Sequence, residues 1–135
     1  TGCVWVVDIV RKAHTGDCVA VSRKELTRTL NGAGLTVETL YDEHLIKTAK
    51  YIAQDINLNG CMNIEFLVTT EKAYLMDINP RFSAGIEFSK IAGYDMPTGH
   101  LSCFSEASLP TLNKQQQLTI TRHYKESIVP VREQR

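Results

Sequence analysis

The stretch Cys61–Gly85, CMNIEFLVTTEKAYLMDINPRFSAG, decides the fold that this sequence predicts. It contains two β-strand patterns, CMNIEFLVT and KAYLMDIN, joined by a short polar turn. Side chains alternate between the two faces of a strand, so only one parity of register brings the apolar faces of both strands together. The predicted pairs are Phe66 with Met76, Val68 with Tyr74, Ile64 with Ile78, Leu67 with Leu75, Glu65 with Asp77 and Asn63 with Asn79.

Two carboxylates therefore face each other near the end of this hairpin. Asp77 follows the apolar run Tyr74–Met76, and a buried carboxylate is costly unless a cation satisfies it. Because like charges directly opposite each other destabilise a sheet, Glu65 and Asp77 should hold a cation or share a proton. Magnesium prefers carboxylate oxygens together with phosphate and water oxygens, and Asn79 adds an amide oxygen at the same end. We predict a metal site formed by Glu65, Asp77 and Asn79.

The residues after the hairpin indicate an anionic ligand. Arg81 offers a planar fork of donors for a phosphate. The residues Ser83–Gly85 open a predicted helix, whose free backbone N–H groups form a natural anion site. One Asp beside one Arg is usually a structural ion pair, because such networks also perturb charges. A larger polar set at the same strand ends favours a nucleotide polyphosphate site; its members are Asn63, Glu65, Asp77, Asn79 and Arg81.

The rest of the chain predicts an α+β sandwich with a mostly antiparallel sheet backed by helices. The first thirty residues read as a β-hairpin that can continue into a third strand. Apolar residues from Glu43 to Ile56 recur at helical spacing after Asp42, a good N-cap. The remaining elements expected are short helices at Ile86–Ala92 and Thr98–Phe104, and an edge strand at 118–131 with Pro130 near its end.

Composition excludes several classes of function. Fifteen basic and fifteen acidic residues cancel, and no long run of like charge favours nucleic acid or a membrane surface as a partner. The four cysteines lack C-x-x-C spacing, which argues against a zinc ribbon or a redox dithiol and favours reduced thiols in the cytoplasm. There is no signal-sequence pattern. The chain begins in a strand-like pattern, so we expect it to be part of a longer polypeptide.

Other polar residues have simpler interpretations. Arg23 and Lys24 adjoin on the second strand, so only one of them can face the nucleotide, and solvated edge charge is the alternative for both. The histidines share no metal-like spacing, and the serines lack the G-x-S-x-G pattern of a hydrolase. The NGAGLT segment, residues 31–36, lacks the Lys-Ser/Thr of a P-loop and is interpreted as a plain loop.

The motif NIEF, followed twelve residues after Glu65 by acidic-x-Asn-Pro-Arg in DINPRFSAG, resembles the carboxyl-terminal half of an ATP-grasp domain. The resemblance is in particular to carbamoyl-phosphate synthetase large-subunit-like proteins. It extends over most of the chain, through AVSRKELTRT, the helix LIKTAKYIAQDI and IAGYDMP. Such enzymes use ATP with Mg²⁺ or Mn²⁺ to phosphorylate a carboxylate, and an amine then captures the acyl-phosphate.

The resemblance also implies roles for single residues. Glu65, Asp77 and Asn79 would bridge ATP phosphates through the metal, and Arg81 would lie near the transferred phosphoryl group. Arg23 resembles a strand arginine that approaches phosphate or the acyl-phosphate. The backbone N–H groups of Ser83, Ala84 and Gly85 would face the anionic substrate. Asp77 stands where glutamate is usual in the family, and Ala84 stands where glycine is common.

The resemblance divides the chain into an ATP-grasp carboxyl-terminal lobe at 1–106, a linker at 107–117 and a final strand and tail at 118–135. Its partners would be a missing amino-terminal lobe, a small carboxylate and an amine, and the piece alone is expected to be nearly inactive. A magnesium phosphohydrolase is a competing interpretation, but it requires a nucleophilic Asp or a base that is not evident. A third is a non-catalytic remnant that pairs its exposed opening strand with another chain, for example in a homodimer.

Overall fold

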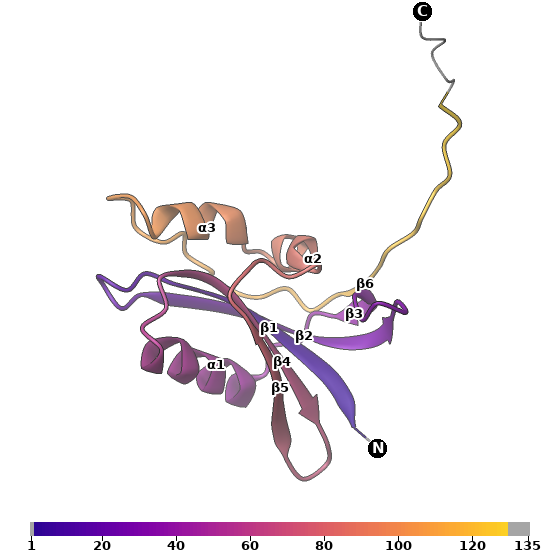
Figure 1. Cartoon of the computed structure of the whole chain (residues 1–135), viewed down its shortest axis with the longest axis horizontal. Coiled ribbons are helices and arrows are strands. Elements are labelled where there is room, and N and C mark those ends of the chain that lie inside the picture. The colour runs from indigo at the N-terminus through magenta and orange to yellow at the C-terminus, as the bar shows by residue number, and fades with distance from the viewer. Residues whose placement is uncertain (1, 130–135) are drawn as a thin grey trace, which may run out of the picture.

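An antiparallel sheet forms the centre of the molecule (Figure 1). The computed structural model describes residues 2–129, and within them six strands pair in the order β5-β4-β1-β2-β3-β6. The elements are β1 Cys3–Arg11, β2 Cys18–Arg28, β3 Gly34–Glu38, α1 Glu43–Asp55, β4 Gly60–Val68, β5 Ala73–Asn79, α2 Ile86–Ile91, α3 Met96–Ser102 and β6 Thr119–Thr121. The α+β fold class expected from the sequence is confirmed.

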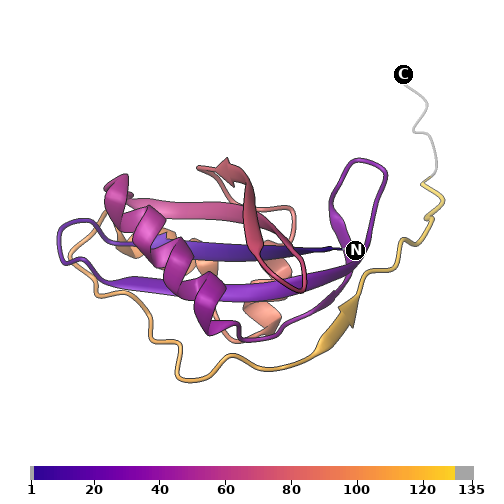
Figure 2. The ribbon, with the colours of Figure 1, turned by 90° about the horizontal axis from the view of Figure 1, so that it is seen from below.

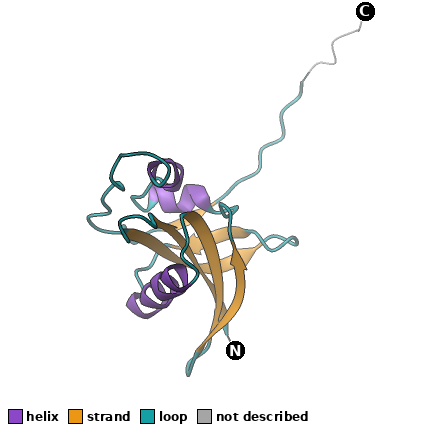
Figure 3. Ribbon diagram, turned by 60° about the vertical axis from the view of Figure 1, so that its left-hand side comes forward, coloured by secondary structure: helices purple, strands orange, loops and turns teal. Residues whose placement is uncertain are grey.

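Helices cover both faces of the sheet. Helix α1 lies on one face, and α2 and α3 lie on the other, as Figures 1 and 3 show. Each face has its own apolar core, since alternate residues of β1 point to opposite sides. The core under α1 contains Val7, Ile9, Leu45, Ala49, Met62, Ile64 and Phe66, and the core under α2 and α3 contains Val10, Val21, Cys61, Ala92, Tyr94 and Met96.

Helix α1 forms where the apolar spacing predicts it. The carboxylate of Asp42 accepts a hydrogen bond from the backbone N–H of Leu45 at 2.9 Å, so the expected N-cap is confirmed. Leu45, Ile46, Ala49 and Ala53 form the buried stripe of the helix. The helix ends one residue before Ile56, which is exposed.

The hairpin β4–β5 has the predicted register only at its polar end. Glu65 lies opposite Asp77 and Asn63 opposite Asn79, as predicted, but Phe66 pairs with Leu75 rather than with Met76. Met76 is the extra residue of a β-bulge, which shifts the remaining pairs by one position. The prediction assumed that burial fixes the register of both strands, whereas Tyr74, Leu75 and Met76 are each about half exposed in β5. Asp77 is exposed as well, so its expected burial is wrong.

Three further expectations about strands and helices need correction. The opening strand β1 pairs with both β2 and β4, so it is interior and cannot offer an edge. The last strand spans only Thr119–Thr121 before the chain leaves the sheet, and Pro130 lies outside the described residues. Helix α3 begins at Met96, two residues before the expected start, because the carboxylate of Asp95 caps it by accepting from Thr98 N.

No helix among residues 2–129 is long and apolar enough to cross a membrane. The four cysteines are free thiols, as the sequence predicts, and those of Cys61 and Cys103 are buried. Burial is the main reason that the pKa of Cys61 rises to about 12.

Candidate functional site

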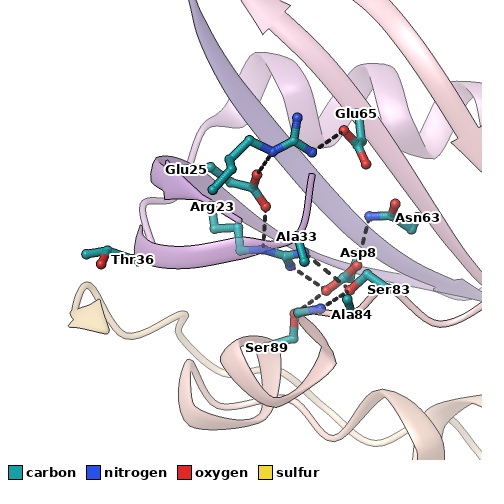
Figure 4. Close-up of polar contacts among 12 residues, drawn as sticks. Asp8, Arg23, Glu25, Ala33, Thr36, Asn63, Glu65, Ser83, Ala84 and Ser89 are labelled. Carbon is teal, nitrogen blue, oxygen red and sulfur yellow. Dashed lines mark hydrogen bonds and ion pairs between the residues drawn. The ribbon is translucent and has the colours of Figure 1, made fainter. Parts of the chain in front are cut away.

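A buried carboxylate lies at the centre of the polar cluster beneath α2. Asp8, on β1, is 1% exposed and accepts hydrogen bonds from three side chains (Figure 4). Arg23 Nη1 donates to its Oδ2 at 2.5 Å, Ser89 Oγ donates to the same oxygen at 2.7 Å, and Asn63 Nδ2 donates to Oδ1 at 3.2 Å. The carboxylate is therefore fully satisfied although it is closed to water.

The sequence interpretation missed Asp8 and expected the buried carboxylate to be Asp77. The signal was present, because Asp8 stands within the apolar run VVDIV, where an acid requires a partner. Its partner is Arg23 on the neighbouring strand β2, two residues beyond Val21, which lies directly opposite Asp8. The interpretation of Arg23 as solvated edge charge is therefore wrong, and only Arg23 of the pair Arg23 and Lys24 is buried in the cluster.

The guanidinium of Arg23 links the cluster to the segment before α2. It is 2% exposed, and its Nη2 donates to Ser83 Oγ at 3.2 Å. Ser83 Oγ also accepts from the backbone N–H of Gly85 at 3.2 Å. A side chain at Gly85 would clash, since a Cβ there would lie 2.5 Å from Arg23 Nη2. Arg23 Nε has no hydrogen-bond partner among the described residues.

A second chain of charges joins β2 to β4. Arg28 Nε lies 2.6 Å from Glu25 Oε2, and Arg28 Nη2 donates to Glu65 Oε2 at 2.8 Å. Burial raises the pKa of Glu25 above its usual value, while Arg23 and Arg28 oppose that shift. Sequence reasoning did not select Glu25 or Arg28, because no local pattern shows that Arg28 will reach across to β4.

These two clusters line a pocket of about 190 Å³ on the α2 side of the sheet. Seven of the sequence-predicted site residues line it, namely Arg23, Asn63, Glu65, Arg81, Ser83, Ala84 and Gly85. The interpretation of the segment 31–36 as a plain loop is wrong for residues 34–36, because they lie in β3. Residues 31–34 of this segment form another wall of the pocket. Three arginines, including Arg28, therefore face one small cavity together with Glu25 and Glu65, which is a suitable environment for an anion bound with a cation.

Asp77 and Asn79 lie beside the pocket and do not line it. Asn79 Nδ2 donates to Asp77 Oδ2 at 2.8 Å, and Arg81 Nη2 donates to Asn79 Oδ1 at 3.1 Å. The three metal ligands predicted from the sequence are oxygen donors on adjacent strands, and Glu65 Oε1 and Asp77 Oδ1 accept no hydrogen bond from the described residues. This donor set fits magnesium, which prefers hard oxygen ligands and retains several waters.

Acidic residues, cysteines and histidines do not by themselves form a metal centre in the described part of the chain, where no three of them gather. A metal at Glu65 and Asp77 would need the amide of Asn79, ligand phosphates or water to complete its coordination. It would also compete with Arg28, which already pairs with one oxygen of Glu65.

Comparison with known proteins identifies the fold family. The model of a family described as "ATP-grasp in the biosynthetic pathway with Ter operon" matches residues 2–128. The chain belongs to this ATP-grasp family. The resemblance carried by NIEF and DINPRFSAG is therefore confirmed at the level of the ATP-grasp domain, a class of ATP-binding, ligase-type folds.

Solved structures show the same fold. Biotin carboxylase from Campylobacter jejuni, in a β,γ-ATP complex, matches with a TM-score of 0.70 and 22% identity over 82% of this chain and 26% of its own. An ADP complex of N5-carboxyaminoimidazole ribonucleotide synthetase matches with a TM-score of 0.72 and 16% identity over 88% of this chain and 33% of its own. Pyruvate carboxylase from Rhizobium etli matches with a TM-score of 0.71 and 16% identity over 86% of this chain and 13% of its own. This ATP-grasp chain thus spans one third or less of each of these proteins.

Proposed function

We propose that the chain is the ATP- and magnesium-binding lobe of an ATP-dependent carboxylate-amine ligase, or of a carbamoyl-phosphate synthetase-like enzyme, acting through an acyl-phosphate. The observation that carries the proposal is the directly opposed pair Glu65 and Asp77 beside a pocket lined by Arg23 and Arg81. Carboxylates that hold a metal next to arginines that face an anion are what phosphoryl transfer requires.

In this proposal Glu65, Asp77 and Asn79 hold the magnesium ion. When bound, the ion neutralises charge on the phosphate oxygens. Arg23 and Arg81 would stabilise negative charge on the phosphoryl group and on the acyl-phosphate. Arg81 must exchange its present contacts, to Asn79 Oδ1 and to the carbonyl of Phe82, for contacts with the ligand.

The segment Ser83–Gly85 would orient the anionic substrate close to Arg23. Arg23 Nη2 and the N–H of Gly85 both donate to Ser83 Oγ, so the two donors are held close together and would exchange this contact for one with the substrate. Asp8 fixes Arg23 from the opposite side and balances its charge. Phosphoryl transfer by positioning and charge stabilisation needs no protein nucleophile, which fits the absence of a hydrolase motif in the sequence.

Further polypeptide would complete the enzyme. The solved neighbours are three or more times the length that the chain covers, and we propose that an amino-terminal lobe supplies the adenine site and more phosphate-binding groups. A small carboxylate and an amine are the proposed substrates. On its own the chain is expected to bind nucleotide weakly and to catalyse little, so micromolar ATP affinity or ligase turnover by the isolated chain would contradict this part of the proposal.

The test is magnesium-dependent binding of a non-hydrolysable ATP analogue to the full-length parent protein. We expect the double variant Glu65→Gln, Asp77→Asn to lose the magnesium-dependent part of the affinity while retaining its fold. The matched control is Glu71→Gln, Asp55→Asn, which makes the same charge change at two exposed positions outside the pocket. Equal magnesium-dependent affinity in both double variants would remove the metal site from the proposal.

An interaction module is the alternative function, and one observation favours it. The outer edge of β5 is unpaired within the described residues, and Tyr74, Leu75 and Met76 on this strand are about half exposed. Such an edge can pair with a second copy to form a homodimer. Sedimentation of the full-length parent with and without Met76→Lys separates the two proposals. A homodimer that the variant loses is expected only of the interaction module, because the ligase proposal does not require dimerisation through this edge.

A further inference from the structure

The outer edge of β2 is only partly used by the sheet. Strand β3 pairs with β2 from Lys24 onward, and Cys18–Ser22 has a strand neighbour on the β1 side alone. A paired strand residue forms hydrogen bonds to the neighbouring strand through its N–H and C=O groups, and successive residues do so on alternate sides of the strand. The open half of β2 therefore needs other partners for every second peptide group.

Gln115 supplies one of these partners with its side chain. Ser22 N donates to Gln115 Oε1 at 3.2 Å, and Gln115 Nε2 donates to Ser22 O at 2.7 Å. Its carboxamide, on a residue that is 4% exposed, reproduces the two hydrogen bonds that a neighbouring strand residue would make. By alternation, the peptide groups of Ala20 and Cys18 face the same side as that of Ser22. No described residue makes a hydrogen bond to them there.

A groove of about 770 Å³ runs along this open edge. Its floor is the edge of β2 from Asp17 to Ala20, one wall is Ile46 and Lys50 of α1, and the other wall is the segment 108–115. Figure 2 shows this segment following the edge of the sheet beside β2. The volume lies within the range of about 300–1,000 Å³ that is typical of ligand sites.

The two sides of the groove differ in character. Cys18 and Ala20 pack against the α1 core, so side chains on that side of an added strand would meet Lys50. Val19 packs against the other core together with Leu109 and Leu112, so side chains on the second side would meet these two leucines. Polar residues of the same wall, among them Asn113 and Lys114, border the leucines. The groove thus offers hydrogen bonds to a backbone, a basic side at Lys50 and an apolar contact at Leu109 and Leu112.

We propose that this groove binds an extended peptide segment of another protein, which adds to the outer edge of β2 as a strand. The segment alternates acidic residues, which face Lys50, with apolar residues, which face Leu109 and Leu112. Its backbone exchanges hydrogen bonds with Ala20 and Cys18, continuing the pattern that Gln115 begins at Ser22. This site lies on β2 away from the nucleotide pocket, and it goes beyond the proposed ligase function.

The first test is amide hydrogen exchange in the free chain, followed residue by residue by NMR. The amides of Ala20 and Cys18 should exchange much faster than those of Val19 and Val21, which face β1. Equal protection at all four positions would show that the edge is already satisfied and would overturn the proposal.

The second test adds a capped hexapeptide of alternating valine and glutamate to the full 135-residue chain. We expect saturable binding, with exchange at Ala20 at least about tenfold slower at saturation. A valine–lysine hexapeptide should bind more weakly, because it places like charge opposite Lys50. Absence of binding, or protection confined to the β5 edge, would overturn the proposal.

Lys50→Glu is the decisive variant. It should weaken binding of the valine–glutamate peptide about two- to fivefold or more, and strengthen binding of the valine–lysine peptide. Lys47→Glu makes the same charge change one turn away on α1, outside the groove, and should leave both affinities unchanged. Identical effects of the two variants, or a concentration-dependent dimer that protects Ala20 without peptide, would contradict the peptide site.

Discussion

Asp8 shows how one buried residue organises the candidate site. It is satisfied by Arg23, Ser89 and Asn63, which come from three different elements, so the cluster ties β1, β2, β4 and α2 together. A buried ion pair adds little net stability compared with apolar packing, but removal of one partner leaves the other charge buried and unpaired. The value of Asp8 to the molecule is therefore the fixed position of the Arg23 guanidinium next to the pocket.

We predict that Asp8→Asn lowers the free energy of unfolding by about 3–5 kcal/mol, because Arg23 loses the partner that compensates its buried charge. Urea unfolding followed by circular dichroism measures the change. The control is Asp17→Asn, at an exposed turn position of the same hairpin, which should change stability by no more than about 0.5 kcal/mol. Similar losses of unfolding free energy in both variants would show that Asp8 does not compensate the buried charge of Arg23.

Single elements bring the site residues to one place. The hairpin β4–β5 holds Glu65 opposite Asp77, and the bulge adjoins this pair, because Met76 directly precedes Asp77 in the chain. A bulge twists and bends its strand, and here it separates the regular polar end of β5 from its exposed apolar half. On the other side of the sheet, Ser22 Oγ joins the start of α1 to β2, because it accepts from Asp42 N at 3.1 Å and donates to Leu40 O.

The start of α1 can be tested at its cap. Asp42→Ala should lower the free energy of unfolding by about 1 kcal/mol, since Leu45 N loses its acceptor and the helix loses a negative charge at its N-terminus. Asp55→Ala, at the other end of the same helix, removes a charge that the helix dipole disfavours, and it should be neutral or slightly stabilising. Thermal or urea unfolding of the two variants distinguishes them, and a larger loss in Asp55→Ala would refute the capping role.

The whole molecule is a sheet with two cores that bury separate sets of side chains. Val6–Arg11 of β1 is continuously buried, because helices cover both faces of the sheet at this strand. The edges differ from this centre, since β5 is exposed and the open half of β2 borders a groove. Contact with other polypeptides is therefore expected at the edges, while the centre holds the site residues in place.

The two-core fold should protect Cys61 from alkylation. Burial, assisted by the nearby charge of Asp8, raises the pKa of Cys61 to about 12. At about pH 8 only about one thiol in 10⁴ would then be ionised, and the thiolate is the form that reacts. Mass spectrometry after iodoacetamide treatment should find Cys61 unmodified in the native chain and modified in urea. Rapid native labelling of Cys61 would contradict the fold at this strand.

Much of the site could be read from the sequence where neighbouring residues determine the structure. The opposition of Glu65 and Asp77 follows from the alternation of side chains in two strands joined by a short turn. The cap at Asp42 and the apolar stripe of α1 are also local patterns, because each depends on residues within one or two turns of the helix. For the same reason DINPRFSAG identified the ATP-grasp domain without any knowledge of the tertiary fold.

Contacts between distant segments could not be deduced in this way. The sequence could not show that Arg23 pairs with Asp8, or that Arg28 reaches Glu65, because both contacts depend on the strand order of the sheet. The predicted register of β4 and β5 beyond Glu65 was wrong for a related reason. Burial dictates the register only where a second layer covers the strand, and β5 is exposed. The sequence by itself determined the family, the helices and the polar strand ends. Only the tertiary structure decided which charges are buried together, because burial and long-range pairing are properties of the assembled sheet.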